Sequence, residues 1–60
     1  MKTATILTVD DDRGFRDVLR DLLNQDPDFQ LIGEAENGEQ AVRSARELHP
    51  DLVLIDVTMP

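Results

Sequence analysis

The sequence has no cysteine, few basic residues and no long hydrophobic run. Without cysteine, neither a disulfide framework nor a thiolate metal site can support the fold. Six Lys and Arg residues against thirteen Asp and Glu residues give a net charge of −7, a balance that repels nucleic acid and anionic membranes. We therefore expect no direct nucleic acid binding by this segment and no membrane binding. If the full-length protein binds DNA, another segment does so.

The first apolar run covers only residues 6–9, and Asp10 interrupts it. This run is too short for a signal peptide core or a membrane span, so a cytoplasmic location is expected. Sixty residues allow one small domain at most, and a domain of this size buries only about 60% of the surface that its unfolded chain exposes. No internal repeat, low-complexity tract or linker divides the chain.

Three short apolar runs predict three β-strands. Residues 6–9 are β-branched or aliphatic, and residues 52–55 are apolar, both without alternation, which is typical of parallel strands buried on both faces. Residues 29–35 alternate in part and contain Gly33, as expected of a strand nearer a sheet edge.

Two amphipathic segments lie between the predicted strands. Residues 15–23 carry apolar side chains at the i, i+3, i+4 spacing of a helix with one buried face. The solvent face of this helix is predicted to carry four charged residues: Arg16, Asp17, Arg20 and Asp21. Asn37 followed by Gln40 predicts a capped second helix that ends at His49 and packs on the first and third strands.

The alternation of strand, helix, strand, helix and strand predicts an α/β fold with parallel strands joined by right-handed crossovers. With the edge-like strand outermost, the sheet has the order 2-1-3, with helices on both faces. After the second strand, the chain crosses back over the sheet, which creates a switch point between the first and third strands. Open α/β sheets bind ligands at the carboxyl ends of the strands beside such a point.

Acidic residues follow both strands at this point: Asp10 and Asp11 after the first, and Asp56 after the third. Carboxylates this close repel one another unless a positive charge holds them together. A hard divalent cation fits, and Mg²⁺ fits best because it uses one or two carboxylates and shares its other positions with water and phosphate. An Asp carboxylate can be the nucleophile in phosphoryl chemistry, and Asp56 is the candidate. Alternatively, residues 10–12 are a solvated acidic turn before the first helix. In either case, Asp12 is expected to cap that helix rather than to bind the metal.

Four segments of the chain resemble the receiver domains of two-component response regulators. They are Val9-Asp10-Asp11, Asp56-Val57-Thr58-Met59-Pro60, the stretch over residues 32–41, and the run over residues 50–56. The acid pair combined with an Asp-x-x-Met-Pro ending is specific in a way that neither part is alone.

The resemblance implies that Asp56 is the phosphoacceptor and that a histidine kinase is the phosphodonor. It further implies that Asp11 and Asp56 bind Mg²⁺ directly, that Asp10 acts through water, and that the backbone carbonyl of Thr58 is a further ligand. The module would be regulatory rather than an enzyme, with self-catalysed phosphotransfer at most.

By this resemblance, residues 1–60 are the N-terminal part of one receiver domain, an incomplete flavodoxin-like fold. The hydroxyl and lysine that sense the phosphoryl group, and the aromatic switch residue, would come from later strands. Residues 26–38 look most like receivers of the LuxR/NarL type, which implies control of transcription in the full-length protein.

The sequence also fits two alternative functions, and its third strand predicts self-association. The chain could be a non-phosphorylated interaction module of receiver type, or a Mg²⁺-dependent phosphohydrolase with residues 56–58 as its nucleophile motif. An exposed third strand, residues 52–55, leaves backbone groups unpaired. We therefore expect the segment to form a homodimer or to aggregate through that strand.

Overall fold

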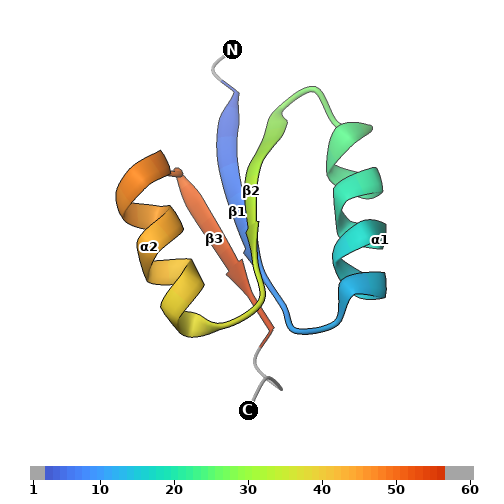
Figure 1. Cartoon of the computed structure of the whole chain (residues 1–60). Coiled ribbons are helices and arrows are strands. Elements are labelled where there is room, and N and C mark those ends of the chain that lie inside the picture. The colour runs from blue at the N-terminus through green and yellow to red at the C-terminus, as the bar shows by residue number, and fades with distance from the viewer. Residues whose placement is uncertain (1–2, 57–60) are drawn as a thin grey trace.

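The computed structural model describes residues 3–56 and shows a parallel sheet with one helix on each face (Figure 1). Its elements are β1 (Ala4–Val9), α1 (Arg13–Asn24), β2 (Phe29–Ala35), α2 (Gly38–Leu48) and β3 (Leu52–Ile55). The strand order is β2-β1-β3, and both strand pairs are parallel. The predicted α/β class, the strand order and the presence of helices on both faces of the sheet are confirmed. No helix within residues 3–56 is long and apolar enough to cross a bilayer.

The central strand β1 forms the core, because residues 6–9 are all at most 2% exposed. Leu7 and Val9 pack with Ala35 of β2 and with two alanines of α2, Ala41 and Ala45. The helix α2 therefore packs on β2 and β1, whereas we predicted that it would pack on the first and third strands.

A bulge in β2 and the glycine that follows it lie beneath the end of α2. Ile6 pairs with Leu31 and the next residue of β1, Leu7, pairs with Gly33, so Ile32 is an extra residue in β2. A Cβ atom at Gly33 would lie 2.7 Å from the Cδ1 atom of Leu48. The absence of a side chain at Gly33 thus leaves room for the end of α2 to lie over β2.

Side-chain caps fix both helix starts as predicted. The Oδ1 atom of Asp12 accepts a hydrogen bond from the Phe15 amide at 3.3 Å, and the Oδ1 atom of Asn37 accepts one from the Gln40 amide at 2.9 Å. Gln40 reaches back to accept from the Glu36 amide at 2.9 Å, one residue before the cap. Helix α2 ends at His49, which adopts the left-handed conformation with φ 50°.

The charged face predicted for α1 is wrong at one position. Arg16 is only 9% exposed, although it was placed on the solvent face with three other charged residues. Conversely, Phe15, Val18 and Leu22 of the apolar stripe are each about half exposed, because α1 packs chiefly on β2. The helix is therefore turned toward β2 more than its apolar stripe alone predicts.

Strand β3 lies at a sheet edge, and its four residues are 40–58% exposed, although their apolar pattern predicted a strand buried on both faces. Its start is tied to β1 by paired hydrogen bonds: the Asp51 amide donates to the Thr5 carbonyl at 2.9 Å, and the Thr5 amide donates to Asp51 Oδ2 at 2.9 Å. Association through this edge stays a prediction.

We predict that Thr8→Val stabilises the fold. The Thr8 side chain is fully buried, and its Oγ1 atom has no hydrogen-bond partner among residues 3–56. Valine has the same shape without the unsatisfied hydroxyl, so the free energy of unfolding should rise by about 1 kcal/mol. Thr5→Val is the matched control, because the Thr5 hydroxyl bonds with Asp51 and its loss should lower stability. Urea unfolding of both variants measures the difference, and a lower midpoint for Thr8→Val contradicts the prediction.

Candidate metal and phosphoacceptor site

Backbone pairing places the acidic residues at one end of the sheet. The Asp10 amide donates to the Ala35 carbonyl at the end of β2 at 3.0 Å, and the Asp56 amide donates to the Val9 carbonyl at 3.0 Å. These two bonds continue the parallel ladders by one residue beyond β1 and β3. Asp10 and Asp56 are consequently held side by side on adjacent strands, at the carboxyl end where the sequence predicted them.

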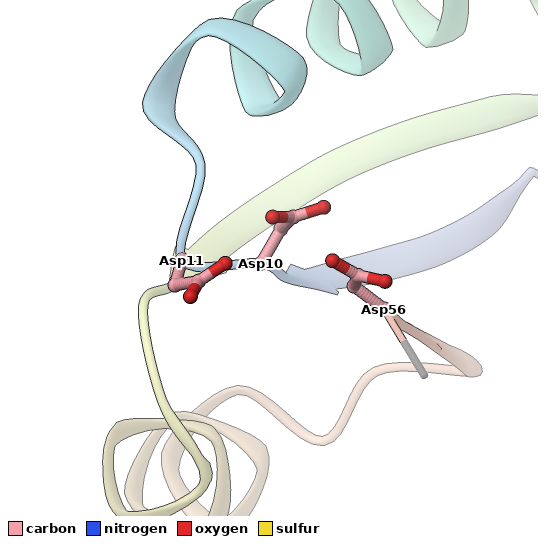
Figure 2. A group of neighbouring side chains, drawn as sticks. All are labelled: Asp10, Asp11 and Asp56. Carbon is pink, nitrogen blue, oxygen red and sulfur yellow. The ribbon is translucent and has the colours of Figure 1, made fainter. Parts of the chain in front are cut away.

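The structure brings the carboxylates of Asp10, Asp11 and Asp56 together (Figure 2). One oxygen from each side chain lies within 4.8 Å of the others. Asp10 is 2% exposed, Asp11 is exposed and Asp56 is partly buried. A cleft of about 250 Å³ has Asp10, Asp12, Phe15 and Asp56 in its wall, so the cluster borders an open space.

A tight turn after β1 orients the two neighbouring acids differently. Asp10 Oδ1 accepts a hydrogen bond from the Asp12 amide at 2.8 Å, so this oxygen stabilises the turn. Asp12 in turn caps α1, and it does not belong to the group of three clustered carboxylates. The assignment of Asp12 to capping rather than to the acid cluster agrees with the structure.

The donor set of the cluster suits a hard divalent cation. All three side chains present carboxylate oxygens, and their spacing allows one ion to be shared. Like charges at this separation oppose one another unless a cation or proton offsets them. The residues thus fit Mg²⁺ chemically. Thr58, whose backbone carbonyl is a predicted ligand, lies outside the described residues.

Sequence reasoning missed one residue beside the cluster. The Arg16 Nη1 atom donates to the Asp10 carbonyl at 2.5 Å, and the same guanidinium lies 3.6 Å from Glu34 Oε1 and 3.7 Å from Glu36 Oε1. No local signal identifies this arginine, because its partners lie in another turn and at the end of β2. Only the folded chain brings them together.

Comparison with known proteins places this arrangement in a family. Residues 6–60 match the response regulator receiver domain family. The chain is 49% identical over 55 residues to a protein-glutamate methylesterase/protein-glutamine glutaminase of Pseudoalteromonas atlantica, covering 92% of this chain and 14% of that protein. It is 46% identical over 57 residues to the nitrate/nitrite response regulator protein NarL of Escherichia coli, covering 95% of this chain and 26% of that protein.

A solved structure shows the same fold. The response regulator domain of Thermotoga maritima CheB superimposes with a TM-score of 0.91 at 39% sequence identity, covering 98% of this chain and 44% of that chain. The agreement supports an incomplete flavodoxin-like fold. Together with the family match over residues 6–60, it shows that the chain belongs to the response regulator receiver domain family, whose members are regulatory modules of two-component signalling.

Proposed function

We propose that this chain is the phosphoaccepting part of a response regulator, in which Asp56 receives a phosphoryl group from a histidine kinase with the help of Mg²⁺. The observation that carries the proposal is the cluster of Asp10, Asp11 and Asp56 at the ends of β1 and β3. Receiver family membership supplies the signalling context. Phosphoryl capture then changes the charge at the end of β3.

In the proposed step, a carboxylate oxygen of Asp56 forms a bond to phosphorus while the phosphorus–nitrogen bond of a phosphohistidine breaks. The electron pair of that bond stays on the imidazole nitrogen, which takes up a proton. The strand pairing between Asp56 and Val9 holds the nucleophile at the mouth of the cleft. The transfer needs an in-line approach of the donor, which the exposed side of the cleft permits.

Mg²⁺ would be held directly by Asp11 and Asp56, with Asp10 acting through water and Thr58 contributing its backbone carbonyl. When bound, the ion neutralises charge on the transferring phosphoryl group and orients it. Asp10 suits a water-mediated role because one of its oxygens already accepts the Asp12 amide. Asp11 is exposed and carries its carboxylate toward the same space as Asp56 (Figure 2).

The extent and output of the protein are also proposed. The match covers 98% of this chain and 44% of the receiver structure, which supports the proposal that residues 1–60 are the N-terminal part of one receiver domain. The likeness to NarL supports a DNA-binding output domain and control of transcription. The protein would act in the cytoplasm. The methylesterase relative favours a second candidate, an enzymatic output domain. Assays of the full-length protein for DNA binding and for glutamyl ester hydrolysis distinguish the two candidates.

The test of the proposed function is phosphorylation of the full-length protein with acetyl phosphate. We expect intact-mass spectrometry to show one added phosphoryl group in the presence of Mg²⁺ and none after chelation, because the clustered carboxylates repel the incoming phosphate without a cation. A phosphorylation level that does not depend on Mg²⁺ contradicts the metal assignment. If the full-length protein is not phosphorylated but still binds a partner protein, the alternative of a non-phosphorylated interaction module is favoured.

A further inference from the structure

Among residues 3–56, Arg16 is a buried charged residue outside the acid cluster. Its side chain is only 10% exposed, and an arginine is rarely buried to this extent unless its charge is paired. Three acceptors surround it, and each is contacted by a different nitrogen. Nη1 donates to the Asp10 carbonyl, Nε lies 3.6 Å from Glu34 and Nη2 lies 3.7 Å from Glu36.

These contacts join three elements at the end of the sheet. Arg16 lies in the first turn of α1, Asp10 follows β1, and Glu34 and Glu36 lie at or just after the end of β2. The guanidinium therefore holds the carbonyl of Asp10, while the Asp10 side chain is held in the following turn, where Oδ1 accepts the Asp12 amide. The peptide that leads from Asp10 to Asp11 is held between these two bonds.

We infer that Arg16 is a positioning residue for the acid cluster: it fixes the peptide after Asp10 so that the Asp11 carboxylate faces Asp56. This inference deepens the proposed function, because the geometry serves Mg²⁺ binding. Arg16 touches neither the clustered carboxylate oxygens nor the cleft beside Asp56. It acts through the Asp10 carbonyl.

The shape of the guanidinium, rather than its charge alone, explains the choice of residue. Arginine presents donors in a planar fork that can serve several acceptors at once, whereas lysine has a single nitrogen on a flexible stem. Lysine at position 16 keeps the charge but cannot hold the Asp10 carbonyl while also meeting Glu34 and Glu36. A role in positioning and a role in charge balance therefore predict different outcomes for Arg16→Lys.

The experiment compares Arg16→Lys and Arg16→Met with wild type in the full-length protein, and the matched control is Arg20→Lys. Arg20 lies one turn further along α1 and pairs with Glu34 at 3.4 Å, but it makes no contact with Asp10. Titration calorimetry measures the dissociation constant for Mg²⁺, and hydrogen exchange measures the protection of the Asp12 amide in the metal-free protein. Thermal melts confirm that each variant is folded at the temperature used.

For Arg16→Lys, we expect the Mg²⁺ dissociation constant to rise about tenfold, as for other residues that orient a metal ligand. Asp12 amide exchange should become faster, and Arg20→Lys should match wild type in both measurements. The inference is overturned if Arg16→Lys has the wild-type Mg²⁺ dissociation constant and the wild-type Asp12 exchange rate. It is also overturned if Arg16→Met binds Mg²⁺ more tightly than wild type, because this result would indicate an effect of charge alone. If wild type binds no Mg²⁺, the proposed metal site fails, while the exchange comparison still decides the role of Arg16.

Discussion

Asp56→Asn is expected to abolish phosphorylation by acetyl phosphate. Asparagine has nearly the same shape as aspartate, and the backbone bond from residue 56 to Val9 does not depend on the side chain, so the end of β3 keeps its place. An amide oxygen, however, is a poor nucleophile and carries no charge to share with a cation. The added phosphoryl mass should therefore fall below detection, the largest effect that we predict for this chain.

The control for Asp56→Asn is Asp21→Asn, which makes the same change at an exposed position of α1. This variant should be phosphorylated at the wild-type rate. The Asp56→Asn protein should also melt no lower than wild type, because it removes one of three clustered like charges. An unchanged phosphoryl signal in Asp56→Asn, or a phosphopeptide that maps to another residue, rules out Asp56 as the acceptor.

The second large effect is expected for Asp11→Asn, which should weaken Mg²⁺ binding on the order of 100-fold. Loss of an outer-shell partner of a metal ligand costs about 10–100-fold in affinity, and Asp11 is proposed to bind the ion directly. Its carboxylate is exposed, so the backbone can tolerate the change without unfolding. Titration calorimetry in the full-length protein measures the dissociation constant.

Asp12→Asn provides the matched control for Asp11→Asn. It removes the same charge from the adjacent residue, and asparagine caps a helix as well as aspartate does, so α1 should start at the same place. Only the long-range charge effect remains, and we expect a change in Mg²⁺ affinity of less than about threefold, since solvent and salt screen exposed charges. Equal losses for the two variants would show that the acidic turn attracts cations only through its total charge.

Three hydrogen bonds hold the backbone and side chain of Asp10 in the acid cluster. Asp10 is bonded through its amide to β2, through its side chain to the Asp12 amide, and through its carbonyl to Arg16. Each bond uses a different group of the residue. The buried acid is therefore fixed, whereas Asp11 stays exposed and accessible to an ion.

The sequence by itself determined the elements of the fold and the identity of the clustered acids. Apolar runs mark all three strands, although the pattern that fits the central strand β1 also occurs in the edge strand β3, and capping residues such as Asn37 set where helices begin. These signals are local, because hydrogen bonds and side-chain spacing within a few residues produce them. The right-handedness of crossovers then leaves few arrangements, so Asp10 and Asp56 could be placed at one end of the sheet in advance.

Only the tertiary structure decided how α1 and α2 are turned and what holds the acids in place. A bulge places Gly33 opposite Leu7, and the missing side chain there leaves room for Leu48 of α2. Arg16 is buried among Asp10, Glu34 and Glu36. The partners of Arg16 lie up to twenty residues away in the chain. No pattern within one helix can reveal them, since the contacts exist only after three separate elements meet.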